Sequence, residues 1–224
     1  TANQPGLGRV TQGAGSVIDL GTGTFGISAD GEVSLQRVNA GGLTASNANS
    51  GYYTYGCLGY YSGCGVASFT ANQALTDSAS GGGTWSVISR GSITTGNVAV
   101  GSVDFRTYGF DQANPLHAGN IQTGTLDAAG VTLSAGNNYY YSSSYSAPVS
   151  VTTGSIGLVR RPDAVSIASG NDGYYAPVRG TVQTGAIEAG TVSVSSIGGE
   201  IRVLGNIGAV GAADSVSLST NQAY

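Results

Sequence analysis

A repeated glycine-containing segment is the feature that most constrains how this 224-residue chain can fold. In each copy an apolar residue, a variable residue, Thr-Gly, a second variable residue and another apolar residue follow one another. The copies lie at 20–25, 93–98, 121–126, 151–156 and 182–187. From residue 93 onward they recur about every 30 residues, a period that is typical of a solenoid, in which similar coils stack on one another.

A second short pattern completes each copy. It is an apolar-polar-apolar triplet, found at 33–35, 103–105, 131–133, 165–167, 192–194 and 216–218. Alternation over so few residues, bounded by glycines, is too short for a helix and predicts β-strands. The first pattern and the triplet together predict two strands and a glycine corner in each coil.

The sequence therefore predicts an all-β chain that forms a single right-handed parallel β-helix of about seven to nine coils. Its one domain spans 1–224, with an irregular start over 1–16 and a long loop over 47–65. The interval between the copies at 20 and 93 leaves room for two or three coils whose pattern is weaker.

Composition narrows the possible partners and the compartment. With 40% hydrophobic and only 9% charged residues, the chain does not have the composition of charge-driven disorder. All eight basic residues are Arg and the net charge is −4, so no basic stripe is available for nucleic acid. No apolar run approaches the roughly 20 residues of a membrane span. The sequence has no Met, and we expect that an N-terminal segment is removed or that the chain is part of a longer precursor.

Two cysteines, Cys57 and Cys64, lie close together in the long loop. Two thiols in one short Tyr- and Ser-rich loop predict a disulfide and an oxidising compartment, which agrees with a secreted, extracellular protein. Free thiols are the alternative. A metal site is disfavoured, because these two cysteines and the distant His117 do not make four ligands.

Tyrosine is concentrated in the insertions between coils. The insertions at 106–118, 137–148 and 171–179 share one phase of the repeat, which predicts that the loops leave the β-helix on one edge. Their rings either shield that edge or form an interaction surface for neighbouring copies, a glycan or a protein. With those of the 47–65 loop, the tyrosines concerned are Tyr52, Tyr53, Tyr55, Tyr60, Tyr61, Tyr108, Tyr139, Tyr140, Tyr141, Tyr145, Tyr174 and Tyr175.

The threonine of the repeat is predicted to point inward, where successive copies would stack as an internal ladder with hydrogen-bonded hydroxyls. The ladder residues are Thr22, Thr95, Thr123, Thr153 and Thr184. An outward threonine array of the kind that ice-binding solenoids use is the other interpretation. The outward neighbours of these residues, however, do not form a regular rank of threonines.

The sequence predicts no enzyme, no cofactor and no metal site. Its acidic residues are scattered, whereas a polysaccharide lyase on a similar fold would need them clustered. Arg160 and Arg161 lie near Asp163 in a turn, where an exposed ion pair is expected. His117 is a lone loop histidine, which is usually only solvated.

The segments 91–98 and 119–136 resemble the degenerate repeats of filamentous haemagglutinin-like proteins. The resemblance covers mainly residues 85–220. It implies a right-handed parallel β-helix, export by two-partner secretion and a place outside the bacterial cell.

Two functions follow as expectations. The first is an extracellular structural protein, the subunit of a bacterial surface filament or rod in which copies stack head to tail, because the repeat has no polar or helical cap at either end. One long rod, of which this chain is a fragment, is the runner-up for the ends. The alternative function is an adhesin segment that binds host glycan or protein through its Tyr-rich loops.

Overall fold

The computed structural model of the chain describes residues 10–29, 32–46, 69–71, 75–76, 83–89, 91–107, 119–136, 148–171 and 178–222. These residues form β-strands and turns, and within these ranges there is no helix. Each β-strand pair of the three sheets is parallel. The prediction of an all-β chain with parallel strands is therefore confirmed.

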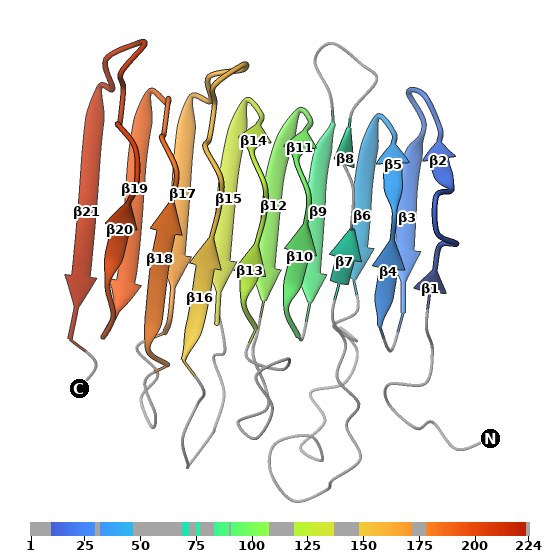
Figure 1. The fold of residues 1–224 in the computed structure, drawn as a ribbon, viewed down its shortest axis with the longest axis horizontal. Coiled ribbons are helices and arrows are strands. Elements are labelled where there is room, and N and C mark those ends of the chain that lie inside the picture. Colours follow the sequence, from blue (N-terminus) through green and yellow to red (C-terminus); the bar gives the residue numbers. More distant parts are fainter. Residues whose placement is uncertain are drawn as a thin grey trace, which may run out of the picture.

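The strands belong to three sheets that run side by side along the molecule (Figure 1). Sheet A consists of β1 (Val10–Thr11), β4 (Val33–Leu35), β7 (Phe69–Ala71), β10 (Ile93–Thr95), β13 (Ile121–Gln122), β16 (Val149–Thr152), β18 (Gly180–Thr184) and β20 (Ile201–Val203). Sheet B consists of β2 (Val17–Asp19), β5 (Arg37–Asn39), β8 (Leu75–Thr76), β11 (Val98–Ala99) and β14 (Leu126–Asp127). Sheet C consists of β3 (Thr24–Ser28), β6 (Gly42–Ser46), β9 (Thr84–Ser89), β12 (Ser102–Thr107), β15 (Gly130–Ala135), β17 (Ala164–Ser169), β19 (Thr191–Ile197) and β21 (Ser215–Asn221).

The chain visits sheets A, B and C in turn, and each such circuit is one coil. Sheets A and C each contain eight strands, which defines coils 1 to 8 in the described part of the chain. In coils 6, 7 and 8 the place of sheet B is taken by single bridging residues, Ile156, Ile187 and Ile207. This arrangement is compatible with a β-solenoid, because each of coils 2 to 7 pairs with the coil before it and the coil after it.

Coils 1 to 5 each have three strands where the sequence predicted two strands and a corner, and coils 6 to 8 have two strands and a bridging residue. In coil 5 the glycine of the repeat, Gly124, separates β13 in sheet A from β14 in sheet B, and the triplet at 131–133 lies in sheet C. The prediction failed because the first pattern holds only two or three residues on either side of its glycine. A pattern of that length is consistent with one bent strand. The residues before and after the glycine nevertheless pair in different sheets.

The copy of the repeat at 20–25 is the second correction. Sheet A of coil 1 is formed by β1, which lies within the predicted irregular start, whereas residues 20–23 turn the corner from sheet B into sheet C. The corner is tight: Gly21 has a φ of 55°, and the Gly23 N–H donates to the Leu20 carbonyl at 2.9 Å. The Thr-Gly dipeptide suits either corner, so the sequence did not distinguish them.

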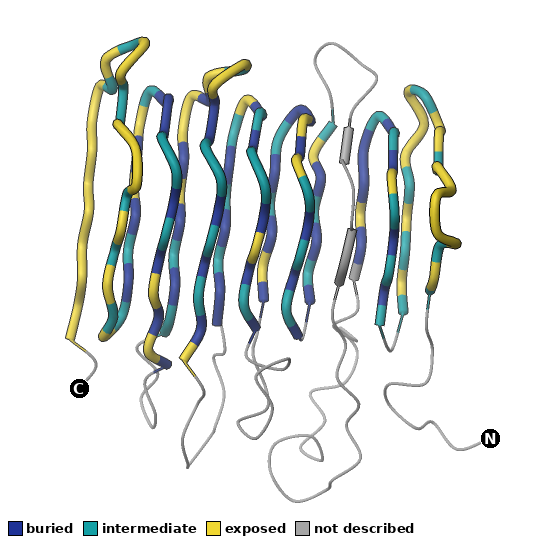
Figure 2. Tube along the Cα trace, viewed as in Figure 1, coloured by how far each residue is buried: buried dark blue, intermediate teal, exposed yellow. Residues whose placement is uncertain are grey.

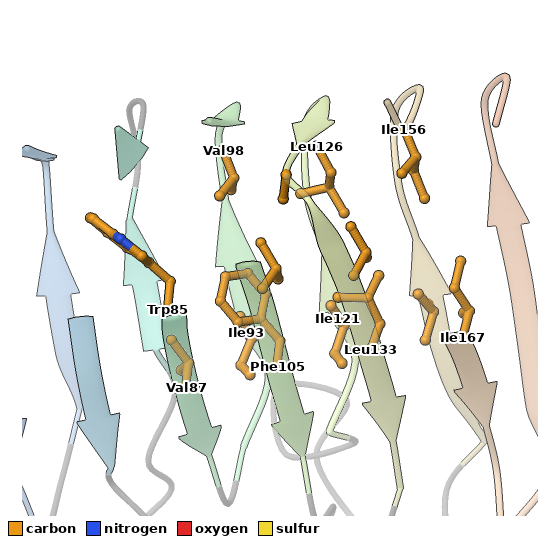
Figure 3. Close-up of a cluster of buried hydrophobic side chains, with 14 of the residues drawn as sticks. Trp85, Val87, Ile93, Val98, Phe105, Ile121, Leu126, Leu133, Ile156 and Ile167 are labelled. Atoms are coloured by element: carbon orange, nitrogen blue, oxygen red, sulfur yellow. The ribbon is translucent and has the colours of Figure 1, made fainter. Parts of the chain in front are cut away.

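The core consists of columns of apolar side chains that run from coil to coil (Figure 3). In sheet C one column contains Leu43, Trp85, Val103, Val131, Val165 and Val192, and the next contains Ala45, Val87, Phe105, Leu133, Ile167 and Val194. All of these side chains are buried. Strand alternation explains the columns, because every second residue of a strand points inward and parallel pairing in register stacks like positions.

Buried hydroxyls close the edge between the end of sheet C and the start of sheet A. Thr107 donates to the Gly119 carbonyl, Ser169 to that of Val149 at 3.4 Å, and Ser196 to that of Gly180. The segments 108–118, 137–147 and 172–177 connect sheet C of one coil to sheet A of the next, and 47–68 does the same between coils 2 and 3. Thr107 thus bonds across the insertion 108–118 that follows it, whereas Ser169 and Ser196 bond the first strand of their own coil, just after the preceding insertion.

Candidate assembly end

Coil 8 exposes side chains at positions that the same columns bury in coils 2 to 7. Val216 and Leu218 of β21 are 48% and 49% exposed, whereas their partners in β19, Val192 and Val194, are each 1% exposed. The difference is visible along the whole of β21, which is coloured as exposed throughout (Figure 2). No described strand lies on the far side of β20 or β21, so both present an unpaired parallel edge.

Exposed apolar side chains concentrate in the two terminal coils of the described chain. Six of the eight large apolar residues that are exposed belong to coil 1 or coil 8, and the other two, Leu158 and Val159, lie in a turn of coil 6. The six are Val17 and Leu20 in coil 1 and Leu204, Val210, Val216 and Leu218 in coil 8. Of these six, Val216 and Leu218 occupy core-column positions, and they mark the surface that a further coil can cover.

A buried carboxylate holds the turn of coil 8 that joins β20 to β21. Glu188 of coil 7 is 3% exposed. Its Oε1 accepts the N–H groups of Ala209 at 2.7 Å and Val210 at 3.1 Å, and its Oε2 accepts those of Val210 at 3.1 Å and Gly211 at 3.3 Å. Three successive backbone N–H groups thus form a nest around one carboxylate.

The electrostatic balance at Glu188 favours its ionised form. Burial on its own would raise the pKa of the carboxyl, but the N–H groups of Val210, Gly211 and Ala209 and the charge of Arg161 together lower it below the ordinary value. Because the hydrogen bonds require the carboxylate as acceptor, the turn depends on this charge.

Arg161 of coil 6 holds the same turn by donating to its backbone carbonyl groups. Its Nη2 donates to the carbonyl groups of Ala189 at 3.0 Å, Gly211 at 3.3 Å and Ala212 at 2.6 Å. We call Arg161, Glu188 and the turn 208–213 the end clamp. The clamp connects coils 6, 7 and 8, and it draws the turn toward the interior of the stack, away from the open face of coil 8.

The arginine pair therefore differs from the exposed ion pair that its sequence predicted. Arg160 donates through Nη1 to the Val100 carbonyl, two coils away, at 3.1 Å, and Arg161 belongs to the end clamp. Glu188, by contrast, carried no local signal in the sequence. Its partners lie 21 to 23 residues further along the chain and are backbone groups, which no side-chain pattern reveals.

Four of the five predicted ladder threonines form one buried column at the corner between sheets A and B: Thr95, Thr123, Thr153 and Thr184. The hydroxyls of Thr123, Thr153 and Thr184 donate to the carbonyl of the glycine that follows each of them, at 3.1, 2.8 and 3.1 Å. The Thr95 hydroxyl is buried without a hydrogen-bond partner. Thr22 is exposed at the other corner, so it is not a member of this column.

The remaining predicted site residues lie outside the described residues. They are the twelve loop tyrosines, Tyr52, Tyr53, Tyr55, Tyr60, Tyr61, Tyr108, Tyr139, Tyr140, Tyr141, Tyr145, Tyr174 and Tyr175, and the cysteines Cys57 and Cys64. His117 lies outside them as well. The predicted disulfide and the predicted interaction loops therefore stay predictions.

Within the described ranges, no group of three or more His, Cys, Asp or Glu side chains is placed to hold a metal ion. The described residues also contain no helix that is long and apolar enough to cross a membrane. No protein-family model, no curated protein and no solved structure matches the chain.

Proposed function

We propose that this chain is a non-enzymatic extracellular structural protein, the subunit of a bacterial surface filament or rod built by end-to-end stacking of right-handed β-helices. The observation that carries the proposal is the open face of coil 8, where Val216 and Leu218 are half exposed at positions that are otherwise core. A further coil placed there would bury both side chains and pair β20 and β21.

The handedness rests on a general rule for parallel sheets. Each circuit leaves a strand of sheet A and returns to the neighbouring parallel strand of sheet A, and such crossovers are right-handed in about 98% of cases. The resemblance of 91–98 and 119–136 to filamentous haemagglutinin-like repeats supports the same handedness and an extracellular place.

The open ends support a filament over a closed oligomer. A contact between the coil 8 face of one copy and the coil 1 face of the next joins two different surfaces. Because the two surfaces lie at opposite ends of the molecule (Figure 1), each added copy leaves a new open end. A contact of this kind does not close on itself and extends into a linear polymer.

The test compares two double variants of the purified full-length chain. Val216→Lys with Leu218→Lys places two charges on the inward side of β21. The matched control, Ser215→Lys with Ser217→Lys, places the same charges on the outward side of the same strand. Electron microscopy and light scattering measure assembly, and circular dichroism melting checks that both variants stay folded.

We expect filaments from the unchanged chain and from the control, and a folded monomer of 22.2 kDa from the inward variant. Lysine at a half-exposed position keeps its ammonium group in water, so folding should tolerate it. The proposal fails if the unchanged chain remains a stable monomer at high concentration, or if both variants assemble equally well.

A further inference from the structure

The columns that end at coil 8 begin at coil 1 with residues of the same kind. In sheet C the two columns start at Phe25 and Ile27 and end at Val216 and Leu218. In sheet A the column runs from Val10 to Ile201, and in sheet B it runs from Ile18 to Ile207. Both ends therefore present four apolar positions, one in sheet A, one in sheet B and two in sheet C.

The column positions of coil 1 are only partly buried. Val10, Ile18, Phe25 and Ile27 pack on the buried core cluster, but each is only partly buried, whereas Val33, Val38 and Leu43 one coil further in are fully buried. These side chains touch the core on one side and lack a described neighbour on the other. They can therefore accept a column from a second molecule.

Unequal side chains do not prevent such stacking, because the columns already combine them. Trp85 stacks between Leu43 and Val103, and Phe105 stacks between Val87 and Leu133. Phe25 on Val216, the least equal of the four intermolecular pairs, repeats the combination of Trp85 and Val103.

The end clamp leaves the face of coil 8 clear. The turn 208–213 is the long connection of that coil, and it would obstruct a further coil if it leaned outward. Glu188 and Arg161 belong to coils 7 and 6, so their hydrogen bonds draw the turn in the opposite direction.

The direction of the strands selects head-to-tail joining. Each pair of strands between neighbouring coils is parallel, and only a head-to-tail contact continues that pattern. A tail-to-tail contact related by a two-fold axis would place β21 antiparallel to β21 of the second copy. If sheet C continued across such a junction, sheets A and B of the two copies would no longer be aligned.

From these observations, and resting on the proposed function, we infer that copies join in one register that continues every column across the junction. In this register β21 pairs with β3 of the next copy, with Val216 opposite Phe25 and Leu218 opposite Ile27. On the outward side of the same strands, Ser217 lies opposite Gly26. Ile201 lies opposite Val10 in sheet A, and Ile207 opposite Ile18 in sheet B.

The outward pair provides a test by disulfide formation. A chain with Ser217→Cys is mixed with a differently tagged chain with Gly26→Cys before assembly and is then oxidised mildly. A Cβ at Gly26 meets no atom within 4 Å, so the substitution fits. Opposite residues of paired strands are about 4.8 Å apart, within the Cα range of a disulfide. Peptide mass spectrometry separates the new bond from bonds to Cys57 or Cys64.

Shifted and homotypic pairs are the controls. Ser219→Cys with Gly26→Cys is displaced by two residues, which puts the Cα atoms roughly 8 Å apart, beyond disulfide reach. Ser217→Cys on its own reports a tail-to-tail contact. We expect the bond between residues 217 and 26 to predominate and the two controls to yield little.

The outcomes separate the register from the proposed function. Filaments in micrographs together with a predominant 219 to 26 or 217 to 217 bond overturn the register and leave the filament. Filaments without any of these bonds also overturn the register. Absence of both filaments and interchain bonds overturns the two proposals together.

Discussion

Glu188 shows at the scale of one residue how a buried charge can organise a turn. A carboxylate in the interior is costly unless hydrogen bonds replace its water. Here three successive backbone N–H groups replace it, and the nearby charge of Arg161 favours the ionised form. The turn 208–213 consequently has one defined position relative to coil 7.

Stability should therefore depend on pH through this residue. The folded-state pKa of Glu188 is lowered, so the ionised form adds stability that is fully present above the ordinary pKa of 4.5. That stability is lost as pH falls through the lower folded-state pKa. Glu188→Gln should lower the melting temperature at neutral pH, and the gap to the unchanged chain should narrow in acid.

Glu200→Gln is the matched control, because the Glu200 side chain is 67% exposed and contacts Arg202 at 3.6 Å. Exposed pairs of this kind contribute little. Thermal unfolding at several pH values measures both variants. A constant gap between Glu188→Gln and the unchanged chain at every pH would contradict the role of the charge.

The glycine corner between sheets A and B determines, at the scale of the element, how closely coils approach. The Gly154 N–H donates to the Gly124 carbonyl at 3.0 Å, and the Gly185 N–H donates to that of Gly154 at 3.2 Å. A Cβ at Gly154 would lie 2.9 Å from the Gly124 carbonyl carbon and 3.0 Å from the Thr125 nitrogen. Backbone of the preceding coil thus occupies the place of a side chain.

Gly154→Ala should destabilise the chain by about 1–3 kcal/mol, because the neighbouring backbone must shift to admit the methyl group. Gly130→Ala is the control within a strand of the preceding coil. Its Cβ would meet only Ser102 Cβ, at 3.9 Å, and it should be neutral or stabilising by about 0.4–1 kcal/mol. Urea unfolding measures both, and equal midpoints for the two variants would refute the close approach.

Much of the element pattern could be predicted from the sequence, and the exceptions have physical causes. The triplets at 131–133 and 165–167 identified β15 and β17, because inward and outward residues alternate strictly there. Residues 20–25 were placed wrongly, since a Thr-Gly corner has the same local chemistry at either bend. The end clamp could not be predicted, because its acceptor and donors come from three coils and half of its groups are backbone.

The whole molecule is a row of coils in which each coil contacts its neighbours in the stack (Figure 1). Eight coils at a strand spacing of about 4.8 Å give a rise of roughly 38 Å per copy. A filament that continues the columns should therefore contain one chain of 22.2 kDa in each rise of roughly 38 Å. Its mass per length should be roughly 0.6 kDa per Å. Scanning transmission electron microscopy measures this mass per length, and twice the value would indicate paired filaments.

The parallel pairing of every coil with the next has a mechanical consequence. The strands lie across the long axis, so the hydrogen bonds between coils point along it. A pull on the two ends of such a rod acts on the layers between coils in series, each layer bearing the full load. Tensile strength is then set by the weakest single layer, and a longer rod is no stronger than a short one.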